Sequence, residues 1–268
     1  MRRLAVLGAA GRMGTTLTRV IGETAGARLS VAVEHAGSAA LGRDAGVLAG
    51  AAANQVAVTA GLPTVGAADA WIDFSVAAAT AAVASAAAER GAALVVGTTA
   101  VDPAGRAALA AAAAHVPVVY APNMSVGVTV LLELVADAAR LLGPGYDLEI
   151  VETHHRLKRD APSGTALRLA EALAEASGGD LDTAARYSRH GDIGPRTPGE
   201  IGIQTLRGGD VVGDHTVMFL GLGERIEITH RASSRETFAR GAVRAALWTA
   251  GKPPGLYDMR DVLGLARG

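Results

Sequence analysis

Residues 3–14 read RLAVLGAAGRMG, a short apolar run that leads directly into three glycines spaced three positions apart. The helical run TTLTRVIGET follows at once. A strand, a Gly-x-x-Gly-x-x-Gly turn and a helix form a variant of the dinucleotide-binding fingerprint. Its glycines permit a tight turn, the close approach of a pyrophosphate and the packing of the helix on the strand. Alone, such a glycine string is a weak indication.

An acidic residue after the second predicted strand strengthens the nucleotide interpretation. That strand, residues 29–33, is followed by Glu34, twenty positions after Gly14. An acidic side chain at this place accepts hydrogen bonds from the adenosine ribose. The alternative is that the glycines serve packing alone and Glu34 is a solvated strand end. Glu34 favours a ribose without a 2′-phosphate, whereas His35 could tolerate one, so NADH and NADPH both stay open.

Strands and helices continue to alternate as far as residue 120. Predicted strands at residues 71–74, 93–96 and 116–120 are separated by predicted helices at residues 77–90 and 103–114. This alternation predicts a Rossmann-like, doubly wound parallel sheet. The turns that follow its strands lie at the carboxyl edge of the sheet, where ligands bind. The turn residues expected beside a bound nucleotide are Gly97, Thr98, Thr99 and Asn123.

The chain changes character after Asn123, where a long amphipathic helix is predicted. Beyond it, predicted strands at residues 147–153, 201–207, 210–219 and 225–231 indicate a second α+β domain with a mixed, mostly antiparallel sheet. Gly-Gly at residues 208–209 predicts a hairpin between the second and third of these strands. The exposed face of such a sheet favours oligomer formation.

Two domains follow from this pattern. Residues 1–123 are predicted to form a dinucleotide-binding domain, and residues 124–234 a substrate-binding and oligomerisation domain. Residues 235–268 are predicted to pack back on the first domain. The Gly-rich and Arg-rich residues 178–199 are interpreted as a solvated or subunit-contacting loop, with a substrate lid as the alternative.

Residues 152–166, ETHHRLKRDAPSGTA, hold the richest chemistry in the chain. His154 and His155 end a predicted strand and point to opposite faces, which disfavours a shared metal ion. Ser163 opens a helix, and a helix N-terminus binds carboxylates or phosphates through its backbone N–H groups. With Lys158 nearby, the stretch predicts an anion site that contains proton donors. The alternative is a loop of solvated cations before an ordinary capped helix.

Composition excludes several classes of function. The 268 residues carry a formal net charge of −1, which argues against a general nucleic-acid or membrane-surface binder. Cysteine is absent, which excludes disulfides, thiolate catalysis and Cys-ligated metals. The apolar run near the N-terminus is too short for a signal peptide, and no uninterrupted apolar stretch suits a membrane span. We therefore expect a cytoplasmic protein.

These motifs together resemble the family of 4-hydroxy-tetrahydrodipicolinate reductases, formerly called dihydrodipicolinate reductases. The resemblance extends over essentially the whole chain, and HHRLKRDAPSGT at residues 154–165 is its most specific part. Further matching segments are GAAGRMG at 8–14, DFS at 73–75, GTT at 97–99, APNMSVG at 121–127, RGGDVVGDH at 207–215 and GLYDM at 255–259. The resemblance implies a homotetramer that uses NADH or NADPH to reduce a cyclic dicarboxylic imine in the diaminopimelate–lysine pathway.

The resemblance also implies roles for individual residues. It makes His154 the catalytic acid/base and Lys158 the proton donor, and it assigns the substrate carboxylates to His155, Gly164 and Thr165. The nucleotide contacts that it implies are Gly8, Ala9, Ala10, Gly11, Arg12, Met13, Glu34, His35, Gly97, Thr98, Thr99, Ala121, Pro122, Asn123 and Met124.

Two positions depart from the usual family pattern. Many members have a basic residue, often Arg, where this chain has His35, and they usually have Phe where Met124 stands. The first departure leaves the choice of nucleotide open, and the second places a flexible thioether near the expected nicotinamide.

The sequence leaves three other functions open. One is an amino-acid dehydrogenase of similar architecture, and another is a non-catalytic nucleotide sensor, which has no need of a proton donor such as Lys158. The third is a zinc hydrolase that uses His154, His155 and either His190 or His215, although no tetrahedral ligand spacing is recognisable.

Overall fold

The computed structural model describes residues 1–265, and the described chain divides into two compact units. One unit comprises Met1–Val126 and Arg235–Gly268, and the other is Gly127–Ser234. Residues 266–268, the end of the segment predicted to pack on the first domain, lie outside the described residues. Among the described residues, no helix is both long and apolar enough to cross a membrane. The roles predicted for the two domains stay predictions.

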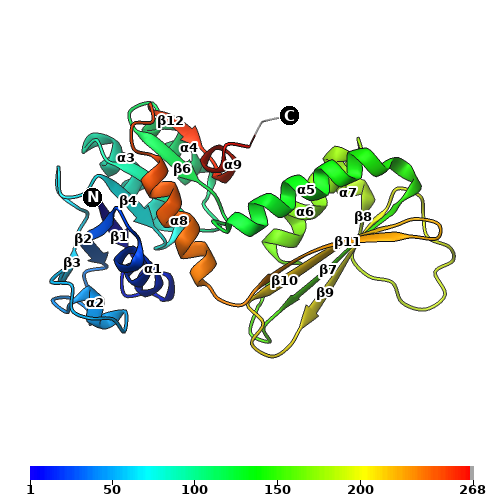
Figure 1. Cartoon of the computed structure of the whole chain (residues 1–268), viewed down its shortest axis with the longest axis horizontal. Coiled ribbons are helices and arrows are strands. Elements are labelled where there is room, and N and C mark those ends of the chain that lie inside the picture. The colour runs from blue at the N-terminus through cyan, green and yellow to red at the C-terminus, as the bar shows by residue number, and fades with distance from the viewer. Residues whose placement is uncertain (266–268) are drawn as a thin grey trace. The chain divides into compact units, whose positions relative to one another are not determined.

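Within residues 1–265, the first unit contains a seven-stranded sheet in the order β12-β6-β5-β4-β1-β2-β3. Every pairing in it is parallel, which confirms the predicted Rossmann-like sheet (Figure 1). The strands are β1 Arg2–Leu7, β2 Ala27–Glu34, β3 Val58–Ala60, β4 Ala70–Asp73, β5 Ala93–Val96, β6 Pro117–Tyr120 and β12 Gly255–Tyr257. The helices are α1 Arg12–Glu23, α2 Ala45–Leu48, η1 Ala77–Ala79, α3 Thr80–Glu89, α4 Pro103–Ala112, α8 Glu236–Trp248 and α9 Met259–Leu263.

Helices cover both faces of this sheet. Leu4 and Val6 of β1 belong to a core that includes α1 and α8, whereas Ala5 and Leu7 belong to a core that includes α3 and α4. Successive side chains of a strand point to opposite faces, so a strand buried on both faces reads as a continuous apolar run. The same holds for β5, whose sequence ALVV is buried throughout. The sheet order changes direction at β1, which makes the carboxyl end of β1 a switch point for ligand binding.

The second unit, within residues 127–234, contains a five-stranded sheet in the order β11-β10-β7-β9-β8. The sheet is mixed as predicted, because β10 pairs antiparallel with β11 and β7, whereas β9 pairs parallel with β7 and β8. Its core joins the sheet to α5 and α6. The elements are α5 Val126–Leu142, η2 Gly143–Gly145, β7 Asp147–His154, α6 Gly164–Ala176, α7 Leu181–Ala184, β8 Ala185–Arg186, β9 Ile201–Arg207, β10 Gly213–Leu220 and β11 Arg225–Ala232.

The predicted hairpin between β9 and β10 is wrong. These strands are not neighbours, because β7 lies between them and pairs with both. The Gly-Gly segment instead carries the chain around the end of β7, where the N–H of Gly208 donates to the carbonyl of His154 at 3.0 Å. A Gly-Gly signal reports only a local reversal of the chain, whereas strand partners are decided by pairing with the distant β7.

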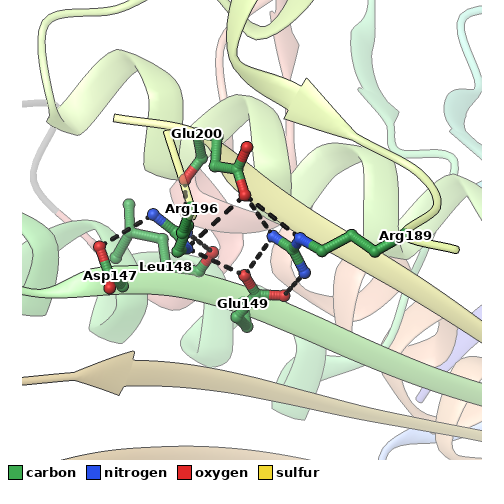
Figure 2. A network of polar contacts seen from close by, with 6 residues as sticks. All are labelled: Asp147, Leu148, Glu149, Arg189, Arg196 and Glu200. Carbon is green, nitrogen blue, oxygen red and sulfur yellow. Dashed lines mark hydrogen bonds and ion pairs between the residues drawn. The ribbon is translucent and has the colours of Figure 1, made fainter. Parts of the chain in front are cut away.

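An ion-pair network fixes the long loop before β9, residues 187–200, to β7. Arg189 donates to both carboxylate oxygens of Glu149, at 2.9 and 2.7 Å, and to Glu200 at 2.6 Å (Figure 2). Arg196 adds a contact of 2.9 Å to Asp147. The hydrogen bonds that Arg189 donates to Glu149 and then to Glu200 raise its pKa above the ordinary value. These contacts hold residues 189–200 against the sheet.

The glycine turn provides a test of the close packing in the first unit. A Cβ on Gly14 would stand inside contact distance of the Gly8 carbonyl oxygen and 2.6 Å from Cα of Ala9. Nothing lies within 4 Å of a Cβ on Gly22 in the same helix. Gly14→Ala should therefore lower the free energy of unfolding by about 1–3 kcal/mol, because backbone must move.

Gly22→Ala is the matched control and should leave that free energy unchanged or raise it by up to about 1 kcal/mol. Urea denaturation followed by circular dichroism measures both variants. Equal effects at the two positions would contradict the close packing at Gly14.

Candidate functional site

The candidate nucleotide site of the first unit begins with the glycine turn at the carboxyl end of β1. Gly8 has a φ of 77°, and a Cβ there would stand 3.2 Å from the carbonyl oxygen of Phe74. Gly11 precedes α1 and brings no side chain to cap it, so backbone N–H groups of the first helical turn face the turn region. Bare glycine backbone before a helix N-terminus fits a nucleotide pyrophosphate.

Glu34 ends β2 and reaches this turn. One carboxylate oxygen accepts from the N–H of Ala10 at 3.0 Å, and the other accepts from the N–H of His35 at 3.1 Å. His35 is exposed directly beside it. The residue predicted to bind ribose therefore lies next to the turn predicted to bind pyrophosphate.

The turns after β4 and β5 contact each other at the same sheet edge. The N–H of Gly97 donates to the carbonyl of Asp73 at 3.0 Å, and the hydroxyl of Thr98 donates to it at 3.3 Å. Gly97 also lies against the ring of Phe74, which leaves no room for a Cβ. Burial raises the pKa of Asp73, whose carboxyl accepts from the hydroxyl and the N–H of Ser75. These bonds join the two turns.

The turn after β6 contains Asn123, whose side-chain oxygen accepts from the N–H of Ser125 at 2.9 Å. Met124 is 1% exposed, and its side chain belongs to the core that includes α8. A Cβ on Gly241 of α8 would overlap the Met124 carbonyl oxygen. The thioether is therefore part of the core and does not lie free beside the expected nicotinamide.

The predicted nucleotide contacts thus all lie at or beside turns on the carboxyl edge of one parallel sheet. They differ in exposure, because some are at the surface and others support the turns from within. The exposed ones are Gly11, Arg12, His35, Thr99 and Pro122, and the buried ones are Ala9, Gly97, Thr98, Ala121 and Met124.

The candidate acid/base site of the second unit is built around a buried carboxylate. Glu152 lies two positions before His154 on β7, so both side chains lie on one face of the strand. Glu152 accepts from His154 Nδ1 at 2.5 Å and from the Arg207 guanidinium at 2.8 and 2.9 Å. It also accepts from the N–H of Ser163 at 3.0 Å and the hydroxyl of Thr205 at 3.2 Å.

These contacts decide the charges within the site. Burial by itself would raise the pKa of Glu152, but hydrogen bonds from Arg207, His154 and Ser163 outweigh it and hold that pKa below its ordinary value. Burial lowers the pKa of His154, and the neighbouring Glu152 opposes this effect. At neutral pH the pair is therefore a carboxylate beside a neutral imidazole.

Lys158 lies on the loop that follows β7. Its ammonium nitrogen is 2.9 Å from Asp160 Oδ2. The backbone N–H of Lys158 donates to the carbonyl of His155 at 3.1 Å. The N–H of His155 donates to the carbonyl of Val211 at 2.8 Å, which fixes this loop to the segment before β10. The Arg207 guanidinium donates to the Asp160 carbonyl at 2.6 Å. The lysine loop is thereby tied to the same arginine that binds Glu152.

The start of α6 lies beside this network. Ser163 caps the helix through its hydroxyl, which accepts from the N–H of Ala166 at 3.2 Å, as the sequence predicted. Gly164 is exposed, and nothing lies within 4 Å of the place of its Cβ. His215 Nε2 is 3.2 Å from the Ser163 hydroxyl, and its ring meets the His154 ring edge-on at 5.1 Å. The helix start predicted to bind a carboxylate is therefore adjacent to the histidine predicted to be the acid/base.

Sequence reasoning missed the partners of His154. Glu152 was detectable, because a carboxylate two positions before a histidine on a strand shares its face. Arg207 was not, because its position opposite His154 depends on the pairing of β7 with β9. The zinc alternative finds no support in residues 1–265, where no group of three or more His, Asp or Glu side chains could hold a metal ion.

Comparison with known proteins covers both units. The family described as "Dihydrodipicolinate reductase, N-terminus" matches residues 2–124, and "Dihydrodipicolinate reductase, C-terminus" matches residues 127–263. A relative from Anaeromyxobacter dehalogenans strain 2CP-1, named 4-hydroxy-tetrahydrodipicolinate reductase, is 59% identical over all of both chains. A relative of the same name from Myxococcus xanthus is 52% identical over 100% of this chain and 99% of its own.

Solved structures share the fold. The dipicolinate-bound dihydrodipicolinate reductase from Paenisporosarcina sp. TG-14 has a TM-score of 0.75 at 22% identity, covering 96% of this chain and 97% of its own. An amine dehydrogenase from Mycobacterium smegmatis has a TM-score of 0.58 at 13% identity, covering 99% and 96%.

The buried His215 predicts a pH dependence of stability. Burial lowers the pKa of His215 to about 4, and the side chain is 3% exposed. The pKa of a histidine in an unfolded chain is about 6.5, so the unfolded state binds the proton first as the pH falls. The protonation of His215 should therefore lower the free energy of unfolding by about 1–3 kcal/mol as the pH falls from about 6.5 to about 4.5.

His215→Gln should remove that part of the pH dependence, because glutamine does not titrate. Urea denaturation at several pH values measures it, with His115→Gln, which removes an exposed imidazole, as the control. The prediction is wrong if His215→Gln has the same pH dependence as the natural protein.

Proposed function

Because this chain belongs to the dihydrodipicolinate reductase family, we propose that it reduces 4-hydroxy-tetrahydrodipicolinate to tetrahydrodipicolinate with NADH or NADPH. The observation that carries the proposal is the location of His154 beside the start of α6, which joins a proton-transfer group to an anion-binding helix end. Relatives that are 52–59% identical over the full chain and named as this reductase support it over an amino-acid dehydrogenase or a nucleotide sensor.

The substrate bears two carboxylates, so its site needs fixed positive potential. In the proposal, the backbone at Gly164 and Thr165 binds one carboxylate at the N-terminus of α6, where the helix dipole favours negative charge. The open space at Gly164 leaves room for a ligand atom to approach the backbone. His155 orients the ring. Dipicolinate bound to the Paenisporosarcina reductase supports a flat dicarboxylate as the ligand class.

Proton transfer is assigned to the second unit. Lys158 donates the proton that accompanies reduction, and His154 acts as the acid/base group beside it. The ammonium of Lys158 already has an anionic partner in Asp160, whose side chain is 60% exposed against 20% for Lys158. A substrate carboxylate could replace that exposed partner at low cost.

Nucleotide binding is assigned to the first unit. When bound, the reduced nicotinamide supplies the hydride. The glycine turn and the N-terminus of α1 bind the pyrophosphate, Glu34 binds the ribose, and residues 97–99 and 121–124 surround the nicotinamide end. We propose that either nucleotide is accepted, because Glu34 suits an unphosphorylated ribose and the exposed His35 can meet a 2′-phosphate.

The assembly is proposed to be a cytoplasmic homotetramer, as the family resemblance implies. The sheet of the second unit supports this, because Leu206 of β9 is 53% exposed on the face opposite the core residue Ile203.

The proposed reaction is tested by an assay coupled to the synthase that produces the substrate, with oxidation of NADH and NADPH followed separately. The natural protein should oxidise at least one nucleotide and be inhibited by pyridine-2,6-dicarboxylate. Lys158→Ala should lower turnover by roughly 10²–10⁴-fold with little change in nucleotide affinity. Lys252→Ala is the control, because Lys252 lies over the Trp248 ring in the first unit. Near-normal turnover of Lys158→Ala would contradict the assignment.

Glu34→Ala should weaken nucleotide binding by roughly 10–100-fold, because it removes charged hydrogen-bond acceptors from the ribose and the glycine turn. Isothermal titration with NADH and NADPH measures the effect. Glu89→Ala, which removes an exposed carboxylate from α3, is the control. An unchanged dissociation constant for Glu34→Ala would remove this residue from the nucleotide site.

A further inference from the structure

We infer that Glu152 is a positioning residue for His154, which holds the imidazole in one tautomer and so selects Nε2 as the nitrogen that exchanges a proton. The role of His154 in this inference rests on the proposed function, whereas the tautomer follows from the contacts and charge of Glu152 and does not depend on the reaction.

The tautomer follows from the chemistry of the contact. Glu152 has no exposed surface, and its Oε2 lies 2.5 Å from His154 Nδ1. An ionised carboxylate can only accept hydrogen bonds, so Nδ1 must carry the hydrogen. In a neutral imidazole the other nitrogen then has the lone pair. Nε2 is therefore the basic atom of this ring.

The carboxylate is held in place on both of its oxygens. Oε2 accepts from Arg207 as well as from His154, and Oε1 accepts from Arg207, from the N–H of Ser163 and from the hydroxyl of Thr205. These donors occupy the carboxylate and keep it ionised in spite of its burial. Glu152 therefore has no capacity left to bind substrate, and it acts through the histidine.

Gly213 keeps one approach to Nε2 free of a side chain, although His154 itself is only 8% exposed. A Cβ on Gly213 of β10 would stand 2.9 Å from His154 Nε2, closer than a packed carbon atom can lie. Gly213 does not have the positive φ that would require glycine for backbone reasons. The missing side chain therefore leaves space at the nitrogen that the carboxylate contact makes basic. A salt bridge that served only to join β7 to β9 would not require this space.

Arg207 extends the same network to the second proton-transfer group. Its guanidinium donates to the carbonyl of Asp160 at 2.6 Å, and the Asp160 carboxylate lies 2.9 Å from the Lys158 ammonium. One arginine thus orients the carboxylate behind His154 and the loop that carries Lys158.

The inference is tested with Glu152→Gln, using ¹H–¹⁵N spectra of the histidine rings at neutral pH. In the natural protein His154, assigned by comparison with His154→Gln, should show the tautomer protonated at Nδ1. Glu152→Gln should convert it to the Nε2-protonated form or to a mixture. Turnover should fall roughly 10²–10⁴-fold with little change in KM, because the basic atom is lost or misdirected.

Glu149→Gln is the matched control. Glu149 also lies on β7 and also binds arginine (Figure 2). It is three positions from Glu152, so it lies on the opposite face of the strand. This variant should lose stability while the His154 tautomer stays as it is. Gly213→Ala is a second test that leaves Glu152 in place, and it should keep the Nδ1 tautomer yet lower turnover at least tenfold by crowding Nε2.

An unchanged tautomer in Glu152→Gln would overturn the inference, even if turnover fell, because the residue would then serve folding alone. If Glu152→Gln does not fold, normal turnover of Gly213→Ala would overturn it. The tautomer in the natural protein can be measured without substrate. Absence of reductase activity would therefore count against the proposed function and leave the positioning by Glu152 to be decided by the spectra.

Discussion

The second unit depends on burying one negative charge. A carboxylate without solvent contact must have its charge and its lone pairs satisfied by the protein, or the group would become neutral. Glu152 meets this requirement with donors from separate segments, namely His154 of β7, Thr205 and Arg207 of β9, and Ser163 at the start of α6. Satisfying that charge brings the end of a strand, its parallel neighbour and a helix N-terminus together. The Glu152 carboxylate therefore fixes the positions of the groups that are proposed to act on the substrate, because its donors come from the segments that carry them.

The first unit is organised by a different constraint, the close packing of glycine backbone against its neighbours. Gly14 against Gly8, Gly97 against Phe74 and Gly241 against Met124 leave no space for a Cβ. The Ala-rich and Gly-rich composition thus permits helices and turns to lie close to the sheet and leaves peptide groups at its carboxyl edge. The candidate nucleotide site consists mainly of main chain, and Glu34 is its chief charged side chain. Backbone suits a pyrophosphate common to many nucleotides, whereas the acid/base site needs specific side chains.

Charge also shapes the long loop of the second unit. Arg189 and Arg196 attach it to Glu149 of β7, and both also contact Glu200 at the end of the loop (Figure 2). Glu149 is three positions from Glu152 and so lies on the other face of the strand. Gly202, opposite Glu149 on β9, provides the space that this carboxylate occupies. The two faces of β7 therefore each carry a buried or half-buried glutamate with an arginine partner. One pair anchors a loop, and the other, through His154, is proposed to serve catalysis.

The sequence alone determined the features that depend on neighbouring residues. The alternation of strands and helices predicted the parallel sheet, the glycine spacing predicted the turn before α1, and Ser163 marked the start of α6. Tertiary structure decided what depends on distant pairing. It placed β7 between β9 and β10 in spite of the Gly-Gly signal, brought Arg207 to Glu152 and put the Met124 side chain in the core. Periodicity and helix capping act over a few residues, whereas strand order and the partners of a buried charge are chosen among segments far apart in the chain, where local pattern carries no information.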